Sequence, residues 1–229
     1  MVMIQFSRTG IQGSDMNKQD SLRTLSKAGL YLVTSSEFST LPVMEVLERF
    51  LKAGGKLFQL REKAFAREQL LETAKMARKL ADQYGAVFIL NDDVDVALAV
   101  NADGVHLGQD DMPIKDARKL LGNDLIIGVS THNIQEAIAA QEDGADYINI
   151  GPVFPTQTKA HAKALGAEGI ELILPYVKVP FTFMGGIKEE NIPALLKYDP
   201  AAVAMVTEIT RASDIESKVK KLLSISLCY

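Results

Sequence analysis

Eight short apolar runs alternate with amphipathic stretches along this chain, and this alternation constrains its fold more than any other feature. The runs are rich in Val, Ile, Leu and Phe at successive positions, which is typical of parallel strands buried on both faces. We predict strands over residues 30–34, 56–60, 86–90, 104–106, 125–129, 147–150, 181–184 and 203–206.

The stretches between the runs have helical spacing. Residues 67–83 place Leu70, Ala74 and Ala77 on one face, and residues 133–143 begin with Asn133, a common N-cap residue. Strand–helix repetition with short loops predicts parallel pairing through right-handed crossovers. Eight such units close into a (β/α)8 TIM barrel of the α/β class.

A doubly wound open sheet is the competing fold. It usually carries a glycine fingerprint after its first strand, and the sequence Val33-Thr34-Ser35-Ser36 has no glycine there. We therefore expect a single barrel domain over residues 29–229. Residues 1–28 are expected to be an N-terminal extension that is mobile or weakly helical, because only Leu22 and Leu25 form an apolar side within it.

Composition excludes several classes of protein. A net charge of −4 argues against binding nucleic acid, which usually needs a basic face. No apolar stretch approaches the roughly 18–20 residues of a membrane span, and the first residues lack the apolar centre of a secretory signal. The single cysteine, Cys228, allows no intrachain disulfide, so we expect a cytoplasmic protein. Its expected partners are small molecules, and a homo-oligomer is left open.

Two cations and an amide follow the second run. In a strand Gln59, Arg61 and Lys63 point the same way, and Arg and Lys are a common pair for phosphate oxygens. The alternative is a solvated strand end in which Glu62 pairs with Arg61. Composition and spacing leave both interpretations open.

Carboxylates follow the third and fourth runs. Asn91 and Asp92 come after one, Asp111 after the next, and carboxylates from adjacent loops can share Mg²⁺ together with phosphate oxygens and water. Alternatively, these residues cap helices. Asp93 or Asp95 also suits that role, and Asp110 and Asp111 could cap the helix that opens at Pro113. We take Asp110 as the carboxylate that does not bind metal.

The histidines do not form a zinc site. His106 lies on a strand, where a hydrogen-bonded core or supporting role is expected for a neutral imidazole. His132 belongs to the start of the next helix and His161 to a loop, so their spacing does not match metal ligands.

The last three loops suit a second anion. After the sixth run, Thr156 and Thr158 can donate to phosphate and Lys159 can neutralise it, although an ordinary surface loop is the alternative. Gly185-Gly186 and Val206-Thr207 follow the seventh and eighth runs, whose loops often bind phosphate in barrels. No nucleophile–base pair is apparent, so departure of a diphosphate from a stabilised carbon, helped by charge neutralisation, fits best.

Six ordered motifs resemble thiamine phosphate synthase, and the likeness runs from about Leu30 to the last helix. The motifs are Gln59-Leu60-Arg61-Glu62-Lys63, Asn91-Asp92, Gly104-Val105-His106-Leu107-Gly108-Gln109-Asp110-Asp111, Gly128-Val129-Ser130-Thr131-His132, Gly151-Pro152-Val153-Phe154-Pro155-Thr156-Gln157-Thr158-Lys159 and Gly185-Gly186-Ile187. The resemblance implies a TIM-barrel transferase of thiamine biosynthesis that uses Mg²⁺. Such an enzyme joins hydroxymethylpyrimidine diphosphate to a thiazole phosphate and releases diphosphate.

The resemblance also implies roles for individual residues. The pyrimidine diphosphate would be held by Gln59, Arg61, Lys63, Asn91, Ser130 and Lys159, of which Arg61, Lys63, Ser130 and Lys159 are taken as catalytic. Asp92 and Asp111 would bind Mg²⁺. The thiazole phosphate would be held by Thr156, Thr158, a glycine of the Gly185-Gly186 pair, Val206 and Thr207.

Two positions depart from the family pattern. Thr207 stands where serine is usual, and Met184 where isoleucine or a small apolar residue is usual. Both lie near the expected thiazole phosphate rather than the diphosphate. The rival interpretations are a thiazole tautomerase-like isomerase with His132 as proton shuttle, and a non-catalytic paralogue that binds thiazole or thiamine phosphate. Neither rival needs Arg61, Lys63 and the two aspartates together.

Overall fold

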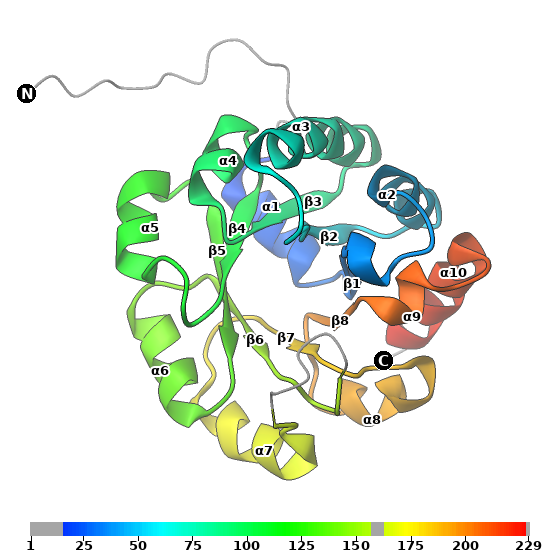
Figure 1. Ribbon diagram of the computed structural model, residues 1–229. Coiled ribbons are helices and arrows are strands. Elements are labelled where there is room, and N and C mark those ends of the chain that lie inside the picture. The colour runs from blue at the N-terminus through cyan, green and yellow to red at the C-terminus, as the bar shows by residue number, and fades with distance from the viewer. Residues whose placement is uncertain (1–15, 157–162, 228–229) are drawn as a thin grey trace, which may run out of the picture.

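Eight parallel strands close into a barrel in the order of the sequence, with β8 paired to β1 (Figure 1). The computed structural model describes residues 16–156 and 163–227. The strands are β1 (Gly29–Val33), β2 (Leu57–Leu60), β3 (Val87–Asn91), β4 (Gly104–Leu107), β5 (Ile126–Thr131), β6 (Tyr147–Ile150), β7 (Phe181–Met184) and β8 (Ala202–Met205). The predicted (β/α)8 barrel is confirmed.

Helices surround the barrel: the first precedes β1, and the others follow the strands and cover the outside (Figure 1). They are α1 (Lys18–Leu25), α2 (Val43–Lys52), α3 (Arg67–Tyr84), α4 (Val94–Ala99), α5 (Ile114–Leu121), α6 (Ile134–Glu142), α7 (Gly166–Ile173), α8 (Ile192–Leu196), α9 (Thr207–Thr210) and α10 (Ile215–Ser226). Short 3-10 turns occur at η1 (Ser36–Phe38), η2 (Leu174–Tyr176) and η3 (Glu189–Asn191).

Every predicted strand is present, but several ends move by one or two residues. The largest difference is at β5, which continues to Thr131 because Ser130 pairs with Asn149 and Thr131 with Ile150 of β6. Asn91 likewise belongs to β3, where it pairs with His106. Polar residues at these ends are held by pairing with a neighbouring strand, which an apolar pattern does not reveal.

Alternating side chains divide the core into two parts. Leu30, Phe58 and Ile148 face outward and pack beneath the helices, whereas Tyr31 and Tyr147 face inward. The inward set fills the barrel with a small cluster that is buried throughout. Residues two apart on each strand therefore point into the interior together. Inward side chains near the carboxyl ends of the strands can reach the open end of the barrel, which we call the mouth.

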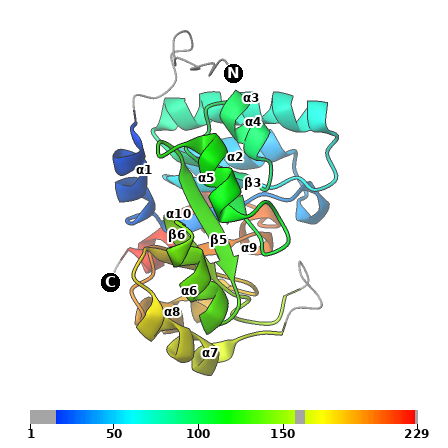
Figure 2. The ribbon, with the colours of Figure 1, turned by 90° about the vertical axis from the view of Figure 1, so that its left-hand side faces the viewer.

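Helix α1 covers the amino end of the barrel. Leu25 is fully buried and Ala28 nearly so, both within the inward cluster, and Lys18 forms an ion pair of 2.7 Å with Asp146. Figure 2 shows α1 on the side opposite the end to which the β5 arrow points. Helix α1 thus covers the amino end of the barrel. A site inside the barrel is therefore expected at the carboxyl ends of the strands. The division of the chain at residue 28 stays a prediction.

In the described ranges, no helix combines the length and the apolar character that crossing a bilayer demands.

Candidate functional site

The predicted polar residues of β2 to β5 gather at the carboxyl end of the barrel. Lys63 Nζ lies 3.4 Å from Asp92 Oδ2, and Asp92 is hydrogen-bonded to Asp111. Asn91 pairs in register with His106, whose ring bonds Ser130. Residues that are far apart in sequence thus line one mouth, as expected for this fold.

The backbone at Asp92 directs its carboxylate away from the following helix. Asp92 has φ of 61°, a left-handed conformation that few non-glycine residues adopt, and its N–H donates to the carbonyl of His106 at 2.9 Å. The next residue, Asp93, caps α4 by accepting from the N–H of Val96 at 3.1 Å. Of the helix-capping alternatives, the one for Asp93 is confirmed, and Asp92 is left for the mouth.

Asp111 does not cap a helix either. Its Oδ2 accepts the N–H of Gly108 at 2.6 Å, while the residue before α5, Pro113, has no side-chain cap. A Cβ on Gly108 would lie 2.8 Å from that same oxygen, so a larger residue here would displace the Asp111 carboxylate. The predicted capping role of Asp111 is therefore wrong, and its carboxylate faces Asp92.

Each of the two carboxyl groups shifts the pKa of the other. Burial raises the pKa of Asp92 to about 6, assisted by the hydrogen bond to Asp111 and its charge. Burial alone would also raise the pKa of Asp111, but hydrogen bonds from Asp92 and from the N–H of Gly108 hold it below its usual value. Because these groups interact strongly they titrate as a pair, with the proton on Asp92.

This pair fits a divalent cation. Two carboxylates in contact concentrate negative charge, which a bound cation can neutralise. Mg²⁺ commonly takes one or two carboxylates and completes its shell with substrate phosphates and water. No cluster of three or more His, Cys, Asp or Glu suited to a metal occurs among the residues with described positions. The remaining ligands of an ion here would thus come from substrate and solvent.

The guanidinium of Arg61 is available to an anion. Arg61 is half-buried, its N–H donates to Thr34 Oγ1 at 3.0 Å, and its guanidinium forms no ion pair with any described residue. Glu62 is buried and turned away, with Oε2 accepting the N–H of Ser36 at 2.8 Å. The alternative pairing of Arg61 with Glu62 is therefore wrong.

A chain of hydrogen bonds crosses the barrel beneath the mouth. Gln59 Nε2 donates to the hydroxyl of Tyr31 at 2.8 Å, and the hydroxyls of Tyr31 and Tyr147 lie 3.0 Å apart. The ring of His106 then joins Tyr147 to Ser130, at 2.9 Å on either side. The expected hydrogen-bonded core position of His106, which is only 4% exposed, is confirmed.

The two tyrosines are site residues that sequence analysis missed. In an apolar run a tyrosine predicts ordinary core, and no signal marks two of them, 116 positions apart, as partners. Burial raises the pKa of both hydroxyls, so they are neutral donors and acceptors. A Cβ at Gly128 would collide with the Tyr147 ring, so this glycine makes room for it.

The loops after β6 and β7 lie side by side. Val153 N–H donates to the carbonyl of Met184 at 2.8 Å, and Phe154 N–H to that of Gly185 at 2.9 Å. Gly185 and Gly186 have φ of 99° and 63°, and a Cβ on Gly186 would meet the Pro155 carbonyl. Only glycine fits this close backbone approach.

The remaining predicted residues lie at the edge of this region. Val206 and Thr207 are half-buried where β8 gives way to α9, and half-buried Thr156 ends the first described segment. Thr158 and Lys159, like His161, lie outside the described residues.

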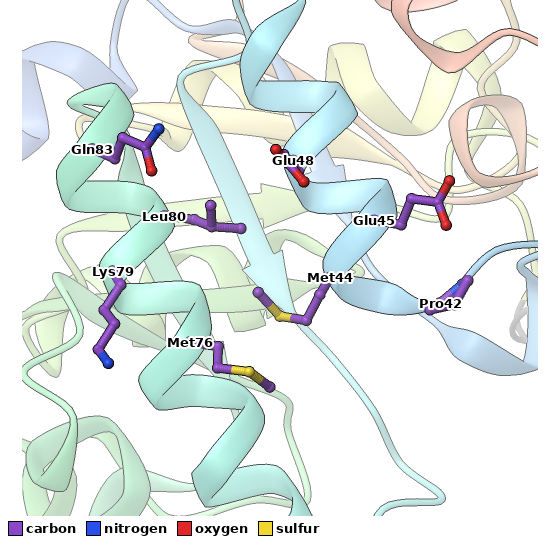
Figure 3. Close-up of a pocket in the computed structure, with 8 residues that line it drawn as sticks. All are labelled: Pro42, Met44, Glu45, Glu48, Met76, Lys79, Leu80 and Gln83. Atoms are coloured by element: carbon purple, nitrogen blue, oxygen red, sulfur yellow. The ribbon is translucent and has the colours of Figure 1, made fainter.

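A separate groove lies between α2 and α3 on the outer wall of the barrel (Figure 3). Met44, Met76 and Leu80 form its apolar part, with Glu45 and Glu48 beside them. It contains none of the predicted site residues, so it is distinct from the mouth.

Comparisons with known proteins agree on one family. A family model described as thiamine monophosphate synthase matches residues 30–209. The chain is 44% identical over 197 residues to a thiamine-phosphate synthase of Shouchella clausii, covering 85% of this chain and 94% of the relative. It is 43% identical over 213 residues to one of Caldicellulosiruptor saccharolyticus, covering 92% and 96%.

A solved structure gives the same result. A thiamine phosphate pyrophosphorylase from Pyrococcus furiosus superimposes with a TM-score of 0.81 at 35% identity. The alignment covers 88% of this chain and 97% of that one.

Proposed function

The chain belongs to the thiamine monophosphate synthase family, and we propose that it joins hydroxymethylpyrimidine diphosphate to a thiazole phosphate, giving thiamine phosphate and diphosphate. The observation that carries this proposal is the contact of Asp92 with Asp111 beside Lys63 at the mouth of the barrel. A carboxylate pair next to cations suits a diphosphate that arrives with Mg²⁺, and the same pair has no evident use in an isomerase.

The diphosphate occupies the side of the mouth formed by β2 to β5. Arg61 offers a planar fork and Lys63 a mobile point charge, and Lys159 is proposed to complete this cationic set. Asp92 and Asp111 would hold Mg²⁺, which when bound neutralises charge on the departing diphosphate. Gln59 and Asn91 line the adjacent barrel interior and are proposed to hold the pyrimidine half, whereas the Ser130 hydroxyl is proposed to bind the diphosphate.

The thiazole phosphate occupies the opposite side. Gly185 and Gly186 bring the backbone of the β7 loop close to the β6 loop, which leaves N–H groups for a phosphate. Thr156, Thr158, Val206 and Thr207 are proposed to complete this subsite. Thr207 retains the hydroxyl of the usual serine and adds a methyl group.

The reaction requires little covalent chemistry from the protein. The bond from the pyrimidine methylene carbon to the diphosphate oxygen breaks, and the electron pair leaves with the diphosphate. The thiazole nitrogen then supplies the pair for the new C–N bond. Arg61, Lys63 and Lys159 stabilise the charge that develops on the leaving group. In this order of steps, departure first and attack second, the protein supplies no nucleophile.

The rival functions have less support. A tautomerase would use His132, but Nδ1 of this residue lies 2.7 Å from Glu136 Oε2 at the start of α6. A non-catalytic binder would have no need of the Asp92–Asp111 contact. A cytoplasmic location and self-association remain predictions from the sequence.

The decisive experiment measures release of diphosphate with both substrates and Mg²⁺ present. We expect release to need all three components and to stop when a chelator removes the metal. Isomerisation of the thiazole phosphate without release of diphosphate would establish the tautomerase instead. Binding of thiamine phosphate with unchanged affinity in the presence of chelator, without turnover, would establish the binder.

A further inference from the structure

We propose that His106 is a positioning residue that makes the Ser130 hydroxyl a hydrogen-bond donor to the diphosphate substrate, through a directed chain of hydrogen bonds beginning at Gln59. This inference rests on the proposed function. It assigns a role to His106, Tyr147 and Tyr31, none of which lies at the mouth itself.

The direction of the chain follows from its first member. The amide nitrogen of Gln59 can only donate, so the Tyr31 oxygen accepts at 2.8 Å. The Tyr31 proton is then free to point at the Tyr147 oxygen, 3.0 Å away. Tyr147 in turn has one proton left, and His106 Nδ1 at 2.9 Å is its acceptor.

The direction of these hydrogen bonds determines which ring nitrogen of His106 carries the proton. Because Nδ1 accepts from Tyr147, a neutral ring carries its proton on Nε2. Nε2 lies 2.9 Å from Ser130 Oγ and therefore donates to it. The hydroxyl proton of Ser130 is then directed away from the ring. The carbonyl of Ser130 is separately held by Gln109 Nε2 at 2.6 Å, so the residue itself is fixed.

Burial keeps the chain in this state. Gln59 is 1% exposed, Tyr31 and Tyr147 are fully buried, and His106 is 4% exposed, so water does not compete for these bonds. A protonated imidazole would place two donors, Nδ1–H and the Tyr147 hydroxyl, against each other. Neutral tyrosines and a neutral histidine are thus required together.

The direction of the chain determines how the Ser130 hydroxyl interacts with the negatively charged substrate. In the proposed direction, Ser130 meets an anionic oxygen with its proton. In the reverse direction it would meet the same oxygen with lone pairs. A hydrogen bond to a charged acceptor is among the stronger kinds, so the direction of the chain affects binding of the diphosphate.

The first test reads the tautomer by nitrogen NMR of the wild-type protein labelled at histidine. The chain has three histidines, and the His106 signals are assigned by their loss in His106→Gln. We expect the proton on Nε2 in the absence of substrate. A proton on Nδ1 would reverse the chain and overturn the proposal. This measurement needs no activity, whereas failure of the wild type to release diphosphate would refute the proposed function alone.

The second test is Tyr147→Phe, which removes the proton donated to Nδ1 but keeps the ring. We expect loss of the pure Nε2–H tautomer and a rise of about ten- to a hundred-fold in KM for the pyrimidine diphosphate. KM for the thiazole phosphate should not change. An unchanged tautomer, or equal rises in both KM values, would contradict the proposal.

Tyr198→Phe is the matched control. Its hydroxyl also donates a hydrogen bond, to Glu171 Oε1 at 2.8 Å, but on the outer side of the barrel. We expect this variant to change neither KM nor the tautomer. His106→Gln, whose amide can accept from Tyr147 and donate to Ser130, should retain more diphosphate affinity than His106→Leu. Equal loss in both variants would indicate a packing role only.

Discussion

Asp92 and Asp111 are hydrogen-bonded to each other across neighbouring loops, with Lys63 3.4 Å from Asp92. Asp92 reaches this position through a left-handed backbone, while Asp93 takes over the capping of α4. Strain of this kind is retained where the surrounding structure enforces it, often at functional sites.

Asp92→Asn should reduce turnover by orders of magnitude, because a neutral amide cannot replace a carboxylate beside Asp111 as a metal ligand. The measurement is the rate of diphosphate release at saturating substrates and Mg²⁺. Asp110→Asn is the matched control, since Asp110 is exposed and adjacent in sequence to Asp111. A near-normal rate in Asp92→Asn would remove Asp92 from the metal site.

Without metal, Asp92 should make the protein less stable as pH rises from about 4 to about 6. The pKa of Asp92 is raised from 3.8 to about 6 in the folded protein, chiefly by burial and then by Asp111. The folded state therefore binds more protons than the unfolded state in this window, so its stability decreases with increasing pH. In urea unfolding, the gap between the free energies of unfolding of Asp92→Asn and wild type should grow across this pH window. Above the window the gap should stay constant. A gap that shrinks with rising pH would refute the raised pKa.

Lys159→Ala should lose turnover by orders of magnitude, because an uncompensated charge would be left on the leaving diphosphate. Lys163→Ala, at the described end of the same loop, is the control and should keep near-normal turnover. Steady-state kinetics with both substrates distinguish them. Similar rates for the two variants would contradict the assignment of Lys159.

Gly186→Ala should raise KM for the thiazole phosphate about ten-fold or more, since a Cβ would force the β7 loop away from the Pro155 carbonyl. Gly85→Ala also places alanine at a positive φ, of 56°, but in open space. Both variants carry backbone strain, but only Gly186→Ala places a Cβ against another loop. Only Gly186→Ala should therefore change the KM for the thiazole phosphate. Equal KM values would exclude the glycine loop from the phosphate subsite.

Thr182→Val should stabilise the protein by about 1 kcal/mol, which is roughly 2–4 °C in Tm for a chain of this size. Thr182 is fully buried in the barrel, and its hydroxyl has no hydrogen-bond partner among the described residues. Valine has nearly the same shape and removes this unsatisfied group. Calorimetry measures the change. A lower Tm would reveal a partner for the hydroxyl, such as a bound water.

Much of the fold could be predicted from sequence alone. Alternating apolar runs and amphipathic stretches determine parallel strands and covering helices, because each run must be buried on both faces. The position of Arg61, Asp92 and Ser130 at the carboxyl ends of β2, β3 and β5 was predictable for the same reason: parallel strands end on one face. Strand ends such as Thr131 were not predictable, since pairing with β6 sets them.

Only the tertiary structure decided which of the neighbouring polar residues serve the site. Asp92 and Asp93 are equivalent in a one-dimensional pattern, and the backbone dihedral angle at Asp92 separates the proposed metal ligand from the helix cap. Tyr31 and Tyr147 become partners because closing the barrel brings strands β1 and β6 to face each other across the interior. Hydrophobic periodicity indicates which face of a strand a residue occupies. Contacts across the barrel depend instead on strand register and on closure of the sheet. Both are set only when all eight strands are assembled.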